Sequence, residues 1–218
     1  MSQTSLIDYY GKRAREYERI YHKPERQTDL ARLREHLRHV LAGRCVLELA
    51  CGTGYWTAAI ADAADSILAT DASEEVLAVA RAKGLDPTRV SFALADAYNP
   101  IQHQGDFTAG LAAFWWSHIP RARLAAFLGR FHAALPPGAR VVFADNRFVL
   151  GSSTPICRTD AAGNTYQQRH LEDGSSHEVL KNFPSSQELR DIIAPHSDTV
   201  EVTTFDYFWC MTYDTRVE

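Results

Sequence analysis

The sequence predicts a single α/β domain built on a largely parallel β-sheet. The first observation is VLELACGTGYW at residues 46–56, where a short apolar strand leads into a glycine-rich turn and then a helix. The second is the alternation of strand-like and helix-like stretches up to about residue 144, which is the pattern of parallel strands joined by crossover helices. The third is the length of 218 residues, which is enough to bury one sizeable core.

Composition narrows the classes of partner and location. The formal net charge is -4 and no basic stripe runs along the chain, so a nucleic acid is a poor candidate for substrate. The N-terminal residues lack the apolar segment of a signal peptide, and the longest apolar run, residues 111–116, is far too short to span a bilayer. Cys45, Cys51, Cys157 and Cys210 are not spaced as metal ligands. We expect a cytoplasmic protein with reduced thiols, no metal and no membrane partner.

The turn after the first strand offers a place for a ligand. Its glycines allow positive φ angles and close approach, and the helix that follows presents free N–H groups. A dinucleotide-binding motif needs a small residue where Thr57 stands, and a P-loop needs a Gly-Lys pair that the chain lacks. The pattern that fits is acidic-x-Gly/Ala-x-Gly-x-Gly, carried by Glu48, Ala50, Gly52 and Gly54. The alternative is a tight turn that binds nothing.

This pattern resembles the first motif of class I S-adenosylmethionine (SAM) methyltransferases. The resemblance implies a Rossmann-like, doubly wound sheet of seven mostly parallel strands, with SAM as cofactor, S-adenosylhomocysteine (SAH) as product and no metal. SAM carries a sulfonium, an ammonium and a carboxylate but no phosphate, so the acidic Glu48 at the strand end suits it. Ala50 replaces the commonest glycine of the motif, which is a change of one methyl group.

Two further acids follow the next two predicted strands. Asp71 follows the strand at residues 66–70, where a carboxylate can bind both hydroxyls of a ribose; a second helix cap is the alternative. Asp96 follows the strand at residues 90–94, at the position that binds the adenine amino group in the family. Ser73 is expected to cap the helix that begins after Asp71. The predicted cofactor-binding residues are Tyr17, Glu48, Ala50, Cys51, Gly52, Gly54, Trp56, Asp71, Ala72, Ser73, Asp96, Ala97, Tyr98 and Phe114.

Residues 1–43 are expected to form an N-terminal helical lid. Helical patterns cover residues 6–21, which are rich in tyrosine, and residues 26–42, which place leucines on one face. Such a pair is similar to the lid of small-molecule methyltransferases, in which a tyrosine of this segment closes over the cofactor or the acceptor. Tyr9 and Tyr21 are therefore candidate acceptor contacts. A surface helix anchored by its aromatic residues is the alternative.

The strand predicted at residues 107–113 leads into FWWSHIP, which should line the binding crevice. This segment resembles the corresponding one of the ubiquinone/menaquinone-methyltransferase-like branch (methyltransferase types 11, 12 and 25). Trp115 and Trp116 cannot both point inward from an extended segment, so one of them should belong to the core. His118 is a candidate general base, or a structural residue that anchors the loop or caps the next helix.

The fifth predicted strand, residues 139–144, is followed by Asp145, Asn146 and Arg147 over the same crevice. Asp145 is a candidate for orienting the acceptor, or a second candidate base, and Asn146 can donate a hydrogen bond to the acceptor. The alternative is a polar strand end whose groups are satisfied by the backbone of the next loop.

Residues 151–184 are predicted to be an insertion that covers the acceptor. Two extended runs, residues 165–171 and 176–183, flank an Asp-Gly pair that is typical of a β-hairpin. Three side chains of this hairpin are candidate acceptor contacts: Tyr166, Arg169 and His170. A dimer contact is an equally good use of the hairpin.

The remaining chain divides into a cofactor-binding core, residues 44–150, and a C-terminal part, residues 185–218. The C-terminal part opens with a capping box formed by Ser185 and Glu188, which predicts a helix to about residue 194. Its strand-rich tail, residues 199–213, should supply the last strands of the sheet, or one long bent strand.

The predicted function is transfer of the SAM methyl group to an N, O or S atom of a small acceptor, aromatic or from secondary metabolism, by in-line displacement. The rivals are a methyltransferase acting on a protein or lipid, a nicotinamide-dependent oxidoreductase, and a non-catalytic SAM-binding module. A monomer or homodimer is expected. The predicted catalytic residues are His118 and Asp145, and the predicted acceptor-binding residues are Tyr9, Tyr21, Trp115, Trp116, Asn146, Arg147, Tyr166 and His170.

Overall fold

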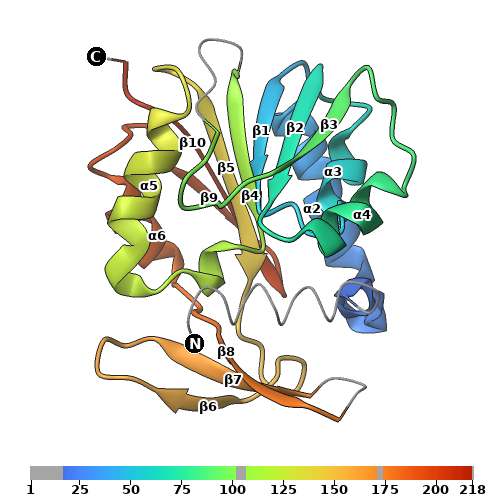
Figure 1. The fold of residues 1–218 in the computed structure, drawn as a ribbon. Helices are drawn as coiled ribbons and strands as arrows, with labels where there is room; N and C mark the ends of the chain where they lie inside the picture. Colours follow the sequence, from blue (N-terminus) through green and yellow to red (C-terminus); the bar gives the residue numbers. More distant parts are fainter. Residues whose placement is uncertain (1–16, 102–106, 171–173, 218) are drawn as a thin grey trace.

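The computed structural model describes residues 17–101, 107–170 and 174–217. Its centre is a seven-stranded sheet in the order β3-β2-β1-β4-β5-β10-β9 (Figure 1). The strands are β1 (Cys45–Leu49), β2 (Ser66–Asp71), β3 (Val90–Leu94), β4 (Ala109–Ala113), β5 (Arg140–Asn146), β9 (Glu201–Thr204) and β10 (Phe208–Asp214). The first five run parallel, and β10 pairs antiparallel with both β5 and β9. The predicted doubly wound, mostly parallel sheet is confirmed.

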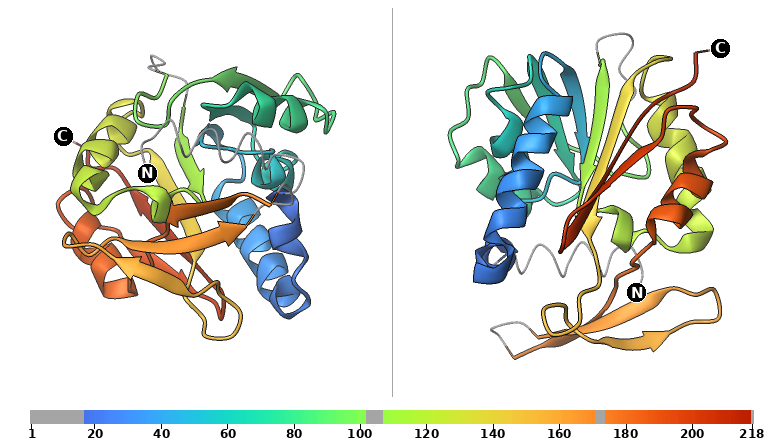
Figure 2. Two further views of the ribbon diagram at one scale, coloured as in Figure 1. Left: turned by 60° about the horizontal axis from the view of Figure 1, so that its bottom comes forward. Right: turned by 180° about the vertical axis from the view of Figure 1, so that it is seen from behind.

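Helices cover both faces of this sheet (Figures 1 and 2). On one face lie α2 (Gln27–Val40), α3 (Tyr55–Ile60) and α4 (Glu74–Arg81), and on the other lie α5 (Leu124–Ala133) and α6 (Ser186–Ile193). The described residues also form short 3-10 helices: η1 (Tyr17–His22), η2 (Pro24–Arg26), η3 (Trp116–His118) and η4 (Arg121–Arg123). None of the helices in the described ranges has the length and apolar character needed to cross a bilayer.

The core forms two layers because successive strand residues point to opposite faces of a sheet. In β1, Val46 belongs to the layer under α2, α3 and α4, whereas Leu47 and Leu49 belong to the layer under α5 and α6. The same period-2 split places Glu48, between the two leucines, on the α2–α4 side. The acidic residue of the glycine motif is therefore buried beneath the helix that the motif begins.

A second, three-stranded sheet lies across the carboxyl ends of the parallel strands (Figures 1 and 2). It consists of β6 (Ile156–Thr159), β7 (Thr165–His170) and β8 (Ser176–Leu180). β7 and β8 pair antiparallel over the two extended runs of the sequence, and β6 adds a strand that was not predicted. All four residues of β6 are exposed. Because no face of this strand is buried, nothing requires its sequence to alternate between apolar and polar residues, and this signal of a strand is missing.

The C-terminal part of the chain forms the predicted helix and strands. Ser185 and Glu188 form the predicted capping box at the start of α6. The tail forms two strands rather than one bent strand, and residues 205–207 make the turn between β9 and β10.

Candidate active site

The glycine-rich turn joins β1 to α3 beside β4, where the strand order changes direction. Crevices in open α/β sheets form at this kind of switch point. Ala50, Gly52 and Gly54 all have positive φ, at 51°, 58° and 75°. Gly54 also lies close to α4, since a Cβ added there would be 3.0 Å from the Cβ of Ala80. The small residues of the motif are therefore required by the path of the backbone.

Glu48 is fully buried at the end of β1. The Thr57 hydroxyl donates to its Oε2 at 2.7 Å, and no described residue hydrogen-bonds its Oε1. Burial raises the pKa of Glu48 to about 8, the Asp71 carboxylate adds to the rise, and the Thr57 hydrogen bond opposes it. Thr57 thus has a local role, holding the carboxyl group of the residue nine positions earlier.

Asp71 ties the end of β2 to the glycine turn. Its Oδ2 accepts from the Gly52 N–H and its Oδ1 accepts from the Ser73 N–H, each at 3.0 Å. Burial raises its pKa, while these backbone donors act in the opposite direction. The cap of α4 is Ser73, whose Oγ accepts from the Val76 N–H at 3.4 Å. Ser73, and not Asp71, is therefore the cap of α4.

Asp96 organises the turn after β3. Its Oδ1 accepts from the Tyr98 N–H at 2.9 Å, and its Oδ2 accepts from the Asn99 side chain at 3.3 Å. Ala97 and Tyr98 are buried, and the guanidinium carbon of Arg123 lies 3.6 Å from the centre of the Tyr98 ring. Because β3, β2 and β1 are neighbours and parallel, Asp96 lies at the same carboxyl end of the sheet as Asp71 and Glu48.

An aromatic cluster occupies the space between η1, the glycine turn and the end of β4. Trp56 stacks on Phe114 with ring centres 5.3 Å apart, and Tyr21 meets both rings edge-on. The Trp56 Nε1–H donates to the Tyr21 hydroxyl at 3.1 Å. Phe114 has a φ of 60°, which is uncommon for a bulky residue and marks a sharp turn after β4. Tyr21 also stacks on Tyr55 with ring centres 4.0 Å apart, and Phe114 meets Phe208 edge-on, so these rings belong to a larger aromatic cluster.

A buried charged network lies at the end of β5. Asp145 accepts from the Ser117 N–H at 2.9 Å, from the Asn146 N–H at 2.7 Å and from Lys181 Nζ at 3.2 Å. Lys181 Nζ is also 3.5 Å from His118 Nε2, and His118 Nδ1 is 2.8 Å from the Leu180 carbonyl oxygen. Because a carbonyl can only accept, Nδ1 carries the hydrogen and Nε2 holds the lone pair that faces Lys181.

The charges of this network follow from its burial and its pairing. Burial, and then the positive charge of Lys181, lower the pKa of His118 to about 3, so the imidazole is neutral. Burial opposes ionisation of Asp145, but the positive charge of Lys181 and the two backbone donors together hold the pKa of this carboxyl below its usual value. Burial lowers the pKa of Lys181 and Asp145 opposes that change. We describe this network as a lysine cation held between a carboxylate and a neutral imidazole.

The methyltransferase domain family matches residues 46–138 of the chain. A demethylmenaquinone methyltransferase of Clavibacter sepedonicus is 32% identical over 105 residues, which are 48% of this chain and 42% of that protein, so the match spans less than half of this relative. Similarity over nearly the whole chain is found with DhpI. Its SAH complex is 30% identical over 99% of this chain and 97% of that chain, with a TM-score of 0.77. Its complex with SAM and HEP is 29% identical over 97% and 98%, with a TM-score of 0.79.

The chain belongs to the class I SAM-dependent methyltransferases. Its site has features that fit SAM. The Glu48 Oε1 is a buried polar atom without a partner among the described residues, which a polar group of a bound ligand would satisfy. A Cβ added to Gly52 would meet nothing within 4 Å, so there is open space beside the turn. Among the described residues, no group of three His, Cys, Asp or Glu side chains is arranged to hold a metal.

The geometry of this methyltransferase does not support a general base at either predicted position. The lone pair of His118 faces Lys181, and its pKa of about 3 makes it a weak base at neutral pH. The carboxylate of Asp145 already accepts from two backbone N–H groups, the Asn146 side chain and Lys181. Both residues position Lys181, and the structural alternatives named from the sequence describe them better.

Other predicted acceptor contacts are also corrected. Trp116 belongs to the core, with its ring 5.0 Å from Phe143, whereas Trp115 is half-buried and remains a candidate. The side chain of Arg147 donates to the Phe205 and Asp206 carbonyls, so it fastens the turn between β9 and β10 instead of facing the crevice.

The predicted hairpin contacts divide between the two faces of β7. Gln167, between Tyr166 and Gln168, is 1% exposed, whereas Gln168 and His170 are exposed. Because a strand alternates, Arg169 shares the inner face with Gln167, and Tyr166 and His170 lie on the outer face. Tyr166 there donates to Asp160 and packs under Arg158. Tyr9 lies outside the described residues, as does the side chain of Tyr17.

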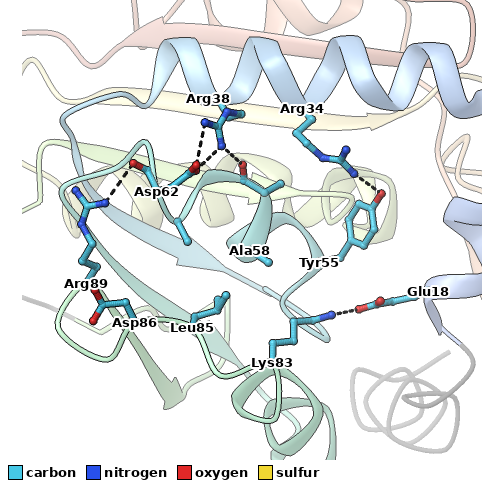
Figure 3. Close-up of a pocket in the computed structure, with 12 residues that line it drawn as sticks. Glu18, Arg34, Arg38, Tyr55, Ala58, Asp62, Lys83, Leu85, Asp86 and Arg89 are labelled. Atoms are coloured by element: carbon cyan, nitrogen blue, oxygen red, sulfur yellow. Dashed lines mark hydrogen bonds and ion pairs between the residues drawn. The ribbon is translucent and has the colours of Figure 1, made fainter.

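An open groove of about 680 Å³ lies between α2, α3 and the segment after α4 (Figure 3). Its charges are largely paired: Arg38 with Asp62, and Lys83 with Glu18 at 2.6 Å. Glu18 also accepts from the Thr53 hydroxyl at 2.8 Å, which fastens η1 to the glycine turn. The charges of the groove thus hold η1 in place against the glycine turn and the segment after α4.

Proposed function

We propose that this methyltransferase transfers the methyl group of SAM to an N, O or S atom of a small acceptor bound beneath the three-stranded sheet. The observation that carries the proposal is that the polar side chains at the carboxyl ends of the strands form two groups. Glu48, Asp71 and Asp96 end the strands on one side of the switch point, and the network of Asp145 and Lys181 ends β5 on the other. A cofactor and an acceptor bound at these two groups, in a cofactor half and an acceptor half of the crevice, would meet over the end of β4.

The cofactor half is assigned from the chemistry of its side chains. Asp71 would accept from the ribose hydroxyls and Asp96 from the adenine amino group, and the turn at Gly52 and Gly54 would hold the amino-acid part of SAM. When bound, SAM supplies an electrophilic methyl group on a sulfonium. The three carboxyl groups and the aromatic cluster would hold that methyl group at a fixed place, where orientation alone contributes a large part of the rate enhancement.

The acceptor half favours a small molecule over a protein or lipid. The insertion β6–β8 covers the carboxyl ends of the strands (Figure 1), which leaves less access for a macromolecule. The relative DhpI supports the same reading, since one of its structures holds HEP together with SAM. We accordingly propose that residues 151–184 form the acceptor cover, 1–43 the lid and 44–150 the cofactor-binding core. The cytoplasmic location and the monomeric or dimeric state stay predictions.

Two measurements test this function. Isothermal titration calorimetry of the full chain should give binding of SAM and none of NADH, and Asp71→Ala should weaken SAM binding at least tenfold. Asp198→Ala, which removes an exposed carboxylate that pairs with Arg216 away from the crevice, should leave SAM binding unchanged. SAM binding that survives Asp71→Ala would remove the cofactor site from the place we assign. Binding of SAM without release of SAH from any of a broad range of acceptors would favour the non-catalytic module.

A further inference from the structure

Four cationic side chains from distant parts of the chain lie near the end of β5. Lys23 and Arg26 share Ser152 as a partner, Arg26 and Lys181 bond to β5, and the charge of Arg169 acts on the other three. Lys23 and Arg26 come from the lid region, Arg169 from the inner face of β7, and Lys181 from the residue after β8. We call these four residues the cation cluster. Two of the four hydrogen-bond to the end of β5: Arg26 Nη1 donates to Asn146 Oδ1 and Lys181 Nζ donates to Asp145 Oδ1, each at 3.2 Å.

The two arginines of the cation cluster hydrogen-bond only to neutral groups among the described residues. Arg26 is 7% exposed, and its Nε and Nη2 donate to the Ser152 hydroxyl at 3.1 and 2.9 Å. Arg169 is half-buried and donates to Thr154 Oγ1 at 2.7 Å and Gln167 Oε1 at 2.6 Å. A buried guanidinium without a carboxylate is costly, and proteins normally pair it.

The carboxylates nearby do not balance the cluster. Asp145 pairs with Lys181, and Glu25, which is exposed, reaches the network through the Ser152 hydroxyl at 2.9 Å. Lys23 Nζ donates to the Ser152 carbonyl at 2.5 Å. Two carboxylates therefore face four cations in the described part of the chain, which leaves an excess of positive charge beside the proposed acceptor.

The titration behaviour of these groups agrees with mutual repulsion. Burial and then the neighbouring Arg26 lower the pKa of Lys23, and Arg169 contributes in the same direction. Burial lowers the pKa of Lys181, with Arg169 and Arg26 adding to the effect against the opposing charge of Asp145. An anion placed among these groups would remove the repulsion.

The geometry points to a small oxyanion as the acceptor class, a molecule whose carboxylate or phosphate-like group binds to Arg26 and Arg169 in front of Lys181. This inference rests on the proposed function, because it names the substrate of that same site. The planar guanidinium groups suit the oxygens of such anions, since each can donate two parallel hydrogen bonds. The cation cluster would thus select acceptors by charge and orient them beside the methyl group.

Calorimetry on the full chain in the presence of SAH tests the inference with matched probes. Phenyl phosphate and benzoate should bind, whereas the uncharged benzamide and the cationic benzylamine should bind at least tenfold more weakly. Arg169→Gln should weaken binding of both anions at least tenfold and Arg169→Lys less so. SAM affinity should change less than twofold in these variants. Arg169 is chosen because it is half-buried, and circular dichroism confirms that each variant is folded.

Arg158→Gln is the matched control. It removes an arginine of the same small sheet that pairs with Glu178 and lies on the outer face, so anion binding should not change. Equal binding of benzamide and benzoate, or anion binding that is insensitive to Arg169→Gln, would overturn the inference. Normal SAM binding with either of those results would leave the cofactor part of the proposed function intact, whereas loss of SAM binding to the unaltered protein would overturn that function itself.

Discussion

Single residues in this site are governed by burial more than by their intrinsic chemistry. His118 would be a suitable base in water, but its buried lone pair faces a lysine. Lys181 shows the converse, since its position in the sequence gives no indication of a role, yet it lies between Asp145 and His118. What a titratable side chain can do here depends on what surrounds it.

Glu48 provides a pH test of this principle. A folded pKa of about 8 against an ordinary value of 4.5 means that the folded protein holds a proton which the unfolded chain releases, so stability is lost as pH rises through that window. Glu48→Gln removes this titration. We expect its free energy of unfolding, relative to the unaltered protein, to rise by up to about 1.4 kcal/mol per pH unit between pH 4.5 and 8. Urea unfolding at several pH values measures this, and parallel curves would contradict it.

The buried pair of Asp145 and Lys181 should behave as one unit. Asp145→Asn leaves a buried lysine without its carboxylate and should lower the free energy of unfolding by about 3–5 kcal/mol. Combining it with Lys181→Met should cost less than the sum of the two single changes, as urea unfolding of all four proteins would show. Glu178→Gln, in the exposed pair with Arg158, should cost no more than about 1 kcal/mol. Additivity within about 0.5 kcal/mol would show that the buried pair is not coupled.

Among the elements, β4 and α5 pack too closely for any side chain at Gly110. A Cβ added there would lie 2.6 Å from the Phe131 ring and 2.8 Å from Leu135 Cδ1. Gly110→Ala should therefore lower the free energy of unfolding by about 1–3 kcal/mol. Gly129→Ala is the matched control, because a Cβ at that exposed position in α5 meets nothing within 4 Å and alanine favours a helix by up to about 1 kcal/mol. Thermal unfolding compares the two, and equal changes would argue against the close contact.

At the scale of the whole molecule, SAM binding should join the two sides of the crevice into one more stable unit. A ligand at a hundred times its dissociation constant adds about 2.7 kcal/mol, which for a chain of this size raises the midpoint of thermal unfolding by about 5–10 °C. We expect this shift with SAM and not with NADH, and expect Asp71→Ala, which weakens SAM binding at least tenfold, to reduce it to about half or less at the same SAM concentration. A similar shift with NADH would mean that the crevice does not distinguish the two ligands.

The sequence by itself determined the parts of this protein that rest on local chemistry. The backbone at Ala50, Gly52 and Gly54 needs small residues, and the capping box at Ser185 needs a hydroxyl followed three residues later by a glutamate, so both could be recognised from short stretches of letters. The alternation of strand-like and helix-like stretches likewise predicted the parallel strands β1 to β5, because these patterns are set by residues that are neighbours in the chain.

Tertiary structure alone decided which distant charged side chains come together at the end of β5. Arg26 and Lys181 are linked through Asn146 and Asp145 only because η2, β5 and the segment after β8 converge, and no periodicity relates residues that lie so far apart in the chain. The face of β7 that turns inward depends on how the small sheet lies on the large one, so Arg169 and not Tyr166 lies on the inner face. Local patterns report the path of the backbone, whereas the balance of buried charge depends on which distant segments fold together.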